Sequence, residues 1–274
     1  MTVIHLSPSD IDGARIEGLR RLPFEEGLLE GEGLIESPPI EIPSFDRLVG
    51  SWNAKTPRAA SVEMHAQVRS EGAWSKWFKL ARRQDASGTS FGPQADDWGS
   101  VAVDVLTLSR KADAVRYRVL LAGGARLLRV SLTLDDSSSE RPPSPPFRPG
   151  PWVRELRVKG RSQMTEQDKY KHDVCSPTSL SMVLDFWKKR GSTEKTALAV
   201  LDAAVPGGFG NWTLNAAYAG ERGLAGEAAW LPSLEALQEE IAAGRPTVVS
   251  VSFSEGELSG SPMPKTKGHL FVVA

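Results

Sequence analysis

The sequence has a single cysteine, Cys175, among its 274 residues. One cysteine cannot form an internal disulfide, and it cannot supply the thiolates of a structural zinc cluster. The chain also lacks any apolar run of about 18 residues, and its start, MTVIHL, has neither the basic region nor the apolar segment of a secretion signal. We therefore expect no membrane-spanning helix and no structural zinc cluster. No metal site is predicted, and a thiol such as Cys175 needs no cofactor to act as a nucleophile.

An excess of charge of one sign is missing as well. The 33 Lys and Arg residues are balanced by 34 Asp and Glu residues, which leaves a formal net charge of −1. Because nucleic acids and anionic membranes attract basic surfaces, we expect neither as a partner. The hydrophobic share of 40% is sufficient for real cores, and the length is compatible with one or two domains.

A Ser- and Pro-rich segment divides the chain. Residues 136–152 include SSSERPPSPPFRPGP. Such segments are extended and semi-rigid and form few contacts. The sequence therefore predicts two domains, 1–135 and 153–274, joined by a linker over 136–152.

The first of these domains is predicted to be all-β. Alternating apolar and polar residues separated by Gly-containing turns predict antiparallel strands and an all-β sandwich. The predicted strands are 60–68, 76–80, 101–108, 114–121 and 126–134. Residues 1–40 carry weak signals, and we expect them to wrap around the sandwich or to stay partly loose.

Three tryptophans of this half allow two interpretations. Trp52, Trp74 and Trp77 could form a stacking platform for sugar rings. In that case the sandwich would bind a glycan or a protein ligand. Sandwich cores also use tryptophan routinely, so packing in the core or at a sheet edge is the more frequent role, and both interpretations stay open.

Cys175 lies directly before a predicted helix. Ser176 is a candidate N-cap and Pro177 fits the first helical position. Basic residues at 188–190 and Gly191 suit the end of the same helix. Its apolar residues recur with helical spacing: Leu180, Val183, Leu184 and Trp187. The thiol would thus lie at the positive end of the helix dipole, beside backbone N–H groups that favour a thiolate and can hold an oxyanion.

A histidine far along the chain could serve as the base. His269 lies on a strand predicted after a central strand at 247–253, with further helices at 196–204 and 234–243 and an entering strand at 153–158. A lone cysteine is more often a small buried residue. A thiol at a helix start together with a histidine on a strand is the pattern of thiolate catalysis.

The other three histidines are weaker candidates. His172 is too close to Cys175 along an extended chain to be assumed a base, whereas His5 and His65 lie in the other half.

Three segments of the second half resemble one family. They are CSPTSLSMVL at 175–184, GNWTLNAAYA at 210–219 and GHLFVV at 268–273. Their order is similar to that of bacterial cysteine peptidases of the bacteriocin-processing, double-glycine-leader type (family thirty-nine), which belong to the papain-like superfamily. The resemblance covers residues 153–274 and implies an α+β papain-like domain.

The same resemblance implies a role for individual residues. Cys175 would be the nucleophile and His269 its general base, while Gln163 would help to form the oxyanion hole, with Gln167 as a weaker candidate. Asn211 and Trp212 would lie in a substrate-binding loop near the cleft. For Trp212, a place in the core is an equal alternative.

The family's third catalytic residue, an Asp or Asn after the histidine strand, has no match in the chain. The sequence ends five residues after His269, inside the apolar run LFVVA. We therefore expect that the peptidase domain is incomplete, truncated at its C-terminus, and that the third residue lies beyond 274. Because relatives of this type are often exported, secretion or a cell-envelope location is expected, with a cytoplasmic location also open.

These observations lead to one main hypothesis and two alternatives. The main hypothesis is a cysteine peptidase that hydrolyses a peptide or protein substrate through a thiolate–imidazolium pair. The first alternative is a catalytically inactive binding protein whose sandwich holds a glycan or a protein. The second is an amidase or acyltransferase that uses the same two residues. Nothing in the sequence supports cleavage of double-glycine leaders specifically.

Overall fold

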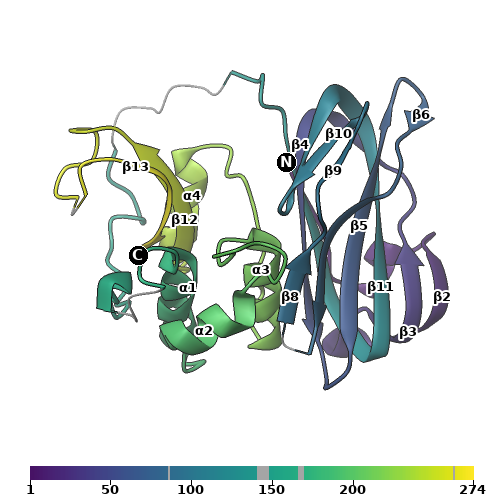
Figure 1. Ribbon diagram of the computed structural model, residues 1–274, viewed down its shortest axis with the longest axis horizontal. Helices are drawn as coiled ribbons and strands as arrows, with labels where there is room; N and C mark the ends of the chain where they lie inside the picture. Colours follow the sequence, from purple (N-terminus) through teal and green to yellow (C-terminus); the bar gives the residue numbers. More distant parts are fainter. Residues whose placement is uncertain (86, 141–147, 166–169, 262) are drawn as a thin grey trace. The chain divides into compact units, whose positions relative to one another are not determined.

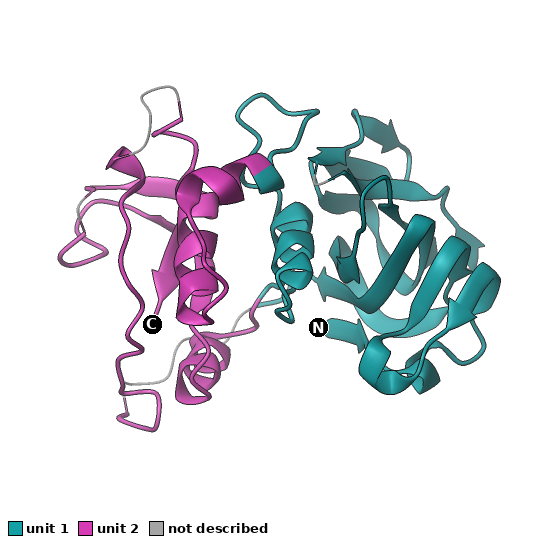
Figure 2. Ribbon diagram, turned by 90° about the horizontal axis from the view of Figure 1, so that it is seen from below, with its two compact units in different colours: residues 1–140, 199–230 teal, residues 141–198, 231–274 magenta. Residues whose placement is uncertain are grey.

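A computed structural model describes residues 1–85, 87–140, 148–165, 170–261 and 263–274. The chain forms two compact units (Figure 2). Unit 1 comprises Met1–Glu140 and Ala199–Trp230, and unit 2 comprises Arg141–Leu198 and Leu231–Ala274. This division differs from the linear one expected from the Ser/Pro-rich segment, because residues 199–230 pack with the N-terminal half.

Unit 1 is a large β-structure. One layer has the strand order β2-β3-β11-β5-β7-β8, and other stretches of the long strand β11 pair with β1, β4 and β10, with β9 beside β10. The two sets of strands face each other as layers (Figure 1). The strands are β1 (Thr2–His5), β2 (Arg15–Arg21), β3 (Leu29–Glu36), β4 (Ile40–Lys55), β5 (Ser61–Ser70), β6 (Ala73–Trp74), β7 (Phe78–Gln84), β8 (Ser87–Ser90), β9 (Gln94–Asp96), β10 (Gly99–Ala102) and β11 (Val105–Asp135).

Strand β11 contains the predicted strands 114–121 and 126–134 as one continuous element. The chain reverses between them at Gly123 and Gly124, whose φ angles are 64° and 75°. A Cβ atom on Gly123 would lie 2.7 Å from the Ala59 carbonyl oxygen, so this turn requires glycine. The predicted strand 101–108 is interrupted by the tight turn at Val103 and Asp104, which separates β10 from β11.

Of the two alternatives for residues 1–40, the structure agrees with the first, because strands of this segment pair with the rest of the sandwich. β1 pairs with residues 130–133 of β11, and the N-terminal ammonium donates a hydrogen bond to Leu134 O at 2.8 Å. β2 pairs with β3 at the edge of the first layer. The sequence signal of β2 is weak because an edge strand buries few side chains, and none of the residues in Arg15–Arg21 is fully buried.

Helix α3 (Trp212–Glu221) completes the core of unit 1. Its residues Leu214 and Ala217 belong to the same buried apolar cluster as the strands. Gly88 of β8 leaves the space that Leu214 fills, since a Cβ there would lie 2.4 Å from Leu214 Cδ1. Figure 2 shows α3 beside the strands in the colour of unit 1. Segment 199–230 is therefore part of this core.

Buried polar contacts hold the same helix. Arg83 is 1% exposed and donates to both carboxylate oxygens of Glu221, at 2.6 and 2.7 Å. Asn53 donates to Ala216 O at 3.2 Å and to Gly226 O at 2.8 Å. Buried polar groups need such partners to avoid a desolvation cost. These contacts fix α3 in register against β4 and β7.

A buried carboxylate caps the start of α3. Asp104 accepts hydrogen bonds from the backbone N–H groups of Trp212 and Thr213. Burial raises the pKa of Asp104 to about 6, and the nearby charge of Asp202 acts in the same direction. Asp104 is therefore a titratable group inside the folded structure at mildly acidic pH.

Unit 2 is a smaller α+β structure. It contains α1 (Cys175–Phe186), α4 (Leu234–Ala242) and the antiparallel pair β12 (Thr247–Phe253) and β13 (Thr266–Val273). Helix α2 (Thr193–Val200) contributes residues to both units, since the division falls between Leu198 and Ala199. No helix in the described part of the chain is long and apolar enough to cross a membrane.

The elements of the second half differ in how closely they follow the sequence pattern. β12 has the predicted bounds, and α4 ends one residue earlier than expected. The helix predicted at 196–204 is formed at Thr193–Val200. The strand predicted at 153–158 is absent, since these residues have no strand partner and only Leu156 among them is buried.

Candidate active site

Cys175 is the first residue of α1, and its side chain is partly exposed. The helix starts two residues earlier than predicted, because Thr178 N already donates to Val174 O at 3.0 Å. Val174 is therefore the N-cap, Ser176 is not the cap, and Pro177 is the third helical residue. Proline carries no N–H, and the Cys175 N–H has no partner among the described residues. This donor beside the thiol is thus available to a ligand.

His269 lies on β13, opposite Val251 of β12. Its ring makes an edge contact with Phe271, with centroids 4.6 Å apart. Partial burial lowers the pKa of the His269 ring below its usual value, which favours the neutral imidazole that can accept a proton. Within the described residues, no hydrogen bond holds either ring nitrogen. Sequence reasoning missed Phe271, although residues two apart on a strand share a face.

Helix α1 and strand β13 lie against each other. Ser179 Oγ donates to Leu270 O at 3.2 Å. Ser179 is one helical turn beyond Cys175 and shares its face, and Leu270 directly follows His269. The fold thus brings the two elements together. It does not form a hydrogen bond between the Cys175 thiol and the His269 ring, both of which are described, so the dyad stays a prediction.

Gln163 starts the short 3-10 turn Gln163–Thr165 in the segment before α1. Its side-chain Nε2 donates to Lys171 O at 2.7 Å. This contact ties the amide to the chain that leads into Cys175. An amide NH2 has two hydrogens, so one N–H remains for another acceptor. The weaker candidate Gln167 lies outside the described residues.

The two predicted substrate-binding residues lie in unit 1. Asn211 is buried and is the N-cap of α3, where its side chain accepts from Leu214 N at 3.0 Å and donates to Asp202 at 3.0 Å. Trp212 is half-buried and makes an edge contact with Trp230, with centroids 6.2 Å apart. Asn211 therefore has a structural task, and substrate binding by either residue stays a prediction.

The remaining histidines of unit 1 have local partners. His5 Nδ1 pairs with Tyr117 Oη at 2.8 Å, and His65 Nε2 pairs with Glu63 at 2.6 Å. Neither lies in the unit that holds Cys175.

The tryptophans of unit 1 follow the packing interpretation for the most part. Trp52 is 1% exposed and belongs to the core. Arg116 stacks on both Trp74 and Trp77, at 4.7 and 5.2 Å from the ring centroids, and Arg118 stacks on Trp77 at 4.1 Å. These guanidinium groups already occupy indole surface that a sugar would need.

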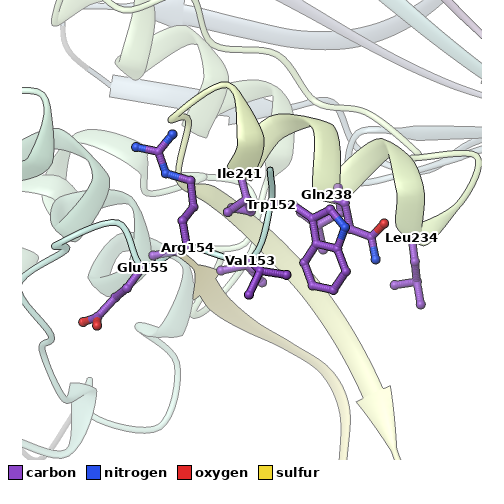
Figure 3. Close-up of a pocket in the computed structure, with 10 residues that line it drawn as sticks. Trp152, Val153, Arg154, Glu155, Leu234, Gln238 and Ile241 are labelled. Atoms are coloured by element: carbon purple, nitrogen blue, oxygen red, sulfur yellow. The ribbon is translucent and has the colours of Figure 1, made fainter. Parts of the chain in front are cut away.

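Unit 2 also contains an apolar groove of about 610 Å³. Trp152 and Val153 lie beside α4, from which Leu234, Gln238 and Ile241 project (Figure 3). Neither Cys175 nor His269 lines it. The groove is therefore separate from the candidate catalytic residues.

Two family models match the chain. Residues 31–132 match the Peptidase C39 N-terminal domain, and residues 155–274 match the Peptidase_C39 like family. The first match lies within unit 1. The second includes residues 199–230, which also belong to unit 1. No curated protein matches the sequence.

Carbohydrate-binding modules are among the solved structures with some likeness to the chain, at low TM-score. The C-terminal CBM6 of LamC, a marine laminarinase from Zobellia galactanivorans, has 13% identity and TM-score 0.31 over 48% of this chain and 99% of that chain. The xylan-binding module CBM15 has 12% identity and TM-score 0.29 over 50% and 100%. Likeness at this level carries no argument about a ligand. The two family matches are consistent with a C39-like peptidase that has an N-terminal domain.

Proposed function

We propose that the chain is a cysteine peptidase in which Cys175 is the nucleophile and His269 is its proton acceptor. The observation that carries the proposal is the contact of α1 with β13, made by Ser179 Oγ and Leu270 O. It joins the helix that starts at Cys175 to the strand that holds His269. The match of residues 155–274 to the Peptidase_C39 like family supports the same conclusion. A papain-like arrangement of this domain is part of the proposal.

The reaction is an acyl transfer to water. The thiol of Cys175 gives its proton to His269, and the sulfur attacks the peptide carbonyl carbon. As the C–S bond forms, the carbonyl π electrons move to the oxygen. The resulting oxyanion accepts hydrogen bonds from the Cys175 N–H and from the second Nε2 hydrogen of Gln163. Collapse of this intermediate breaks the C–N bond, and His269 returns the proton to the leaving amine.

The second half-reaction restores the enzyme. A water molecule gives a proton to His269 and attacks the thioester carbon. The C–S bond then breaks, the carboxylic product leaves, and the sulfur regains its proton. The neutral form of His269, which partial burial favours by lowering the ring pKa, suits both proton-accepting steps.

The test compares two histidines at fixed protein concentration. The 274-residue chain is assayed with fluorescein-labelled casein as the probe, beside the variants Cys175→Ala, His269→Ala and His172→Ala. We expect the first two to lose at least about a thousandfold in rate. His172, three residues before Cys175, is the matched control and should retain most of the activity. Equal rates for His269→Ala and His172→Ala would exclude His269 as the base.

A measurement without a substrate supports the same test. Iodoacetamide reacts with the thiolate, so its rate of reaction with Cys175 reports how readily the thiol loses its proton. We expect this rate at pH 7 to exceed that of the unfolded chain and to fall in His269→Ala. An equal rate in the folded and unfolded protein would contradict activation of the thiol.

One observation favours a second candidate, a catalytically inactive binding protein. Among the described residues, the His269 ring has no hydrogen-bond partner to fix its orientation, and Gln163 already donates to Lys171 O. In this case the chain would hold a peptide, or a glycan or protein on unit 1, without hydrolysis. Casein turnover that is identical in the unaltered chain and in Cys175→Ala would favour this candidate. An amidase or acyltransferase would instead lose its activity in that variant.

A further inference from the structure

Arg161 connects three parts of unit 2. Its Nη1 donates to Ser181 Oγ at 2.8 Å, and its Nη2 donates to Gly191 O at 2.8 Å and forms an ion pair with Asp185. Its backbone N–H also contacts Met182 Sδ at 3.0 Å. The side chain therefore ties the segment before α1 to the body of that helix and to the chain that follows it.

The partners of Arg161 are themselves fixed. Asp185 accepts from Gly191 N at 2.6 Å, so carboxylate, guanidinium and backbone form one closed network. Gly191 lies directly on α1, since a Cβ there would be 2.3 Å from Ser181 O. A planar guanidinium can reach all of these acceptors at once, whereas an ammonium group acts as a point charge. The network thus depends on arginine at this position.

The turn after Arg161 holds Gln163. Thr165 donates from its backbone N–H and from Oγ1 to Ser162 O, at 3.3 and 2.8 Å. The Gln163 amide is then tied to Lys171 O at 2.7 Å. The short, hydrogen-bonded turn that contains Gln163 thus begins directly after Arg161. Nothing in the sequence pattern around Cys175 pointed to this role.

We propose that Arg161 is a positioning residue for the oxyanion hole: it fixes the Ser162–Thr165 turn to the helix of the nucleophile, so that the second N–H of the Gln163 amide is held for the carbonyl oxygen. This inference rests on the proposed peptidase function. Arg161 does not touch the reacting atoms, and it acts through Gln163. The closing experiment therefore separates the two residues.

The test is a double-mutant cycle with Arg161→Lys and Gln163→Ala, assayed with fluorescein-labelled casein. Removing an oxyanion donor lowers kcat by about a hundredfold or more. We expect Arg161→Lys to lower kcat by about tenfold with KM unchanged, because the donor is misplaced rather than lost. In the Gln163→Ala background the same substitution should have no further effect. Arg154→Lys, whose arginine donates to Ala242 O at 3.2 Å elsewhere in unit 2, is the matched control and should change neither parameter.

Several outcomes would overturn the inference. If Arg161→Lys lowers kcat equally in both backgrounds, the residue is merely structural. If Gln163→Ala has full activity while Cys175→Ala has none, the peptidase function holds but the oxyanion role of Gln163 and the inference fall together. Asp185→Asn, which weakens the ion pair and leaves Arg161 in place, should give a smaller loss in the same direction and replaces Arg161→Lys if that variant does not fold.

A second readout does not depend on activity. With ¹⁵N-glutamine labelling, the Gln163 side-chain NH2 signals are assigned by their loss in Gln163→Ala. We expect the proton bonded to Lys171 O to exchange slowly in the unaltered chain and in Arg154→Lys, and at least about tenfold faster in Arg161→Lys. If exchange is unchanged in Arg161→Lys, Arg161 does not position this amide, whatever the activity of the chain.

Discussion

The two units of the molecule differ in how completely they bury their strands. In β5 of unit 1, eight of ten residues are fully buried, and the core continues into α3. In unit 2, neither β12 nor β13 has a fully buried residue, and the well-packed element is α1. Apolar burial is the main favourable term in folding. Unit 1 therefore carries most of the stability, whereas the candidate catalytic residues lie in the less buried unit, as is common for functional regions.

The largest effect should come from cutting the chain between its two sequence halves. A site-specific protease sequence placed at 141–147 would give fragments 1–140 and 148–274. Because residues 199–230 belong to the core of unit 1, we expect the fragments to co-elute in size-exclusion chromatography and to separate only in denaturant. Fragment 148–274 made alone should be insoluble or lose α3. Two fragments that separate without denaturant would instead support the linear division into 1–135 and 153–274.

The next largest effect concerns the buried ion pair of unit 1. Arg83→Ala leaves the Glu221 carboxylate without its charged partner, although the Thr56 hydroxyl still donates to it, and leaves Ala199 O without the Arg83 donor. Breaking such a pair from one side costs roughly 3 to 5 kcal/mol of unfolding free energy. Urea denaturation, monitored by circular dichroism, measures this loss of unfolding free energy. The double variant Arg83→Met with Glu221→Leu should recover most of the loss, and Arg20→Ala, from an exposed pair with Glu30, should cost less than about 1 kcal/mol.

Local patterns predicted the strands better than they predicted the division of the chain. The alternation over 247–253 and the turn at Gly123 and Gly124 are encoded by nearby residues, and the structure contains both. The place of residues 199–230 depends on long-range contacts such as Arg83 with Glu221 and Asn53 with Gly226. The pattern of a single sequence does not indicate which residues so far apart along the chain are in contact. Exposed edge strands such as β2 were missed because they bury too little to alternate clearly.

At the candidate site, too, local patterns predicted the elements but not the contacts between them. The helix at Cys175 and the strand at His269 follow from periodicity, but their contact through Ser179 and Leu270 is tertiary. Arg161 could not be singled out, since its acceptors lie on α1 and in the chain beyond it. One sequence signal could have placed Asn211 as a cap: Asn before a helical segment is a common N-cap, and its side chain takes that role.

A smaller effect should appear in the pH dependence of unit 1. Burial raises the pKa of Asp104 from 3.8 to about 6. The folded state therefore binds this proton more tightly than the unfolded chain, so the contribution to stability is complete below about pH 3.8 and is lost as the pH rises through 6. We expect the unfolding free energy contributed by this group to fall by roughly 2 to 3 kcal/mol over that range.

Asp104→Asn isolates this group, because the amide oxygen can still accept an N–H from α3 while its charge is gone. Urea denaturation at pH 4.5 and 7.5 should show the difference in the unaltered chain and a much smaller one in Asp104→Asn. The exposed neighbour Asp97→Asn serves as the control and should behave like the unaltered chain. A pH dependence that persists in Asp104→Asn would mean that Asp104 is not the group responsible for it.

The smallest effect is expected at the ring of His269 in unit 2. Partial burial lowers the pKa of His269. The Phe271 ring makes an edge contact with the His269 ring, with the two ring centroids 4.6 Å apart. Phe271→Ala removes part of that burial, so water can solvate the imidazolium and the pKa of His269 should rise toward its ordinary value of 6.5. NMR titration of the His269 ring, assigned by its absence in His269→Ala, measures the shift without requiring activity.

Phe271→Leu keeps apolar bulk at the same position and should shift the pKa of His269 less. If the chain is a peptidase, the acid limb of its pH profile should move upward with the same shift in Phe271→Ala. An unchanged titration would show that burial by other parts of unit 2 sets the pKa, and that the site is more enclosed than its half-buried strands indicate.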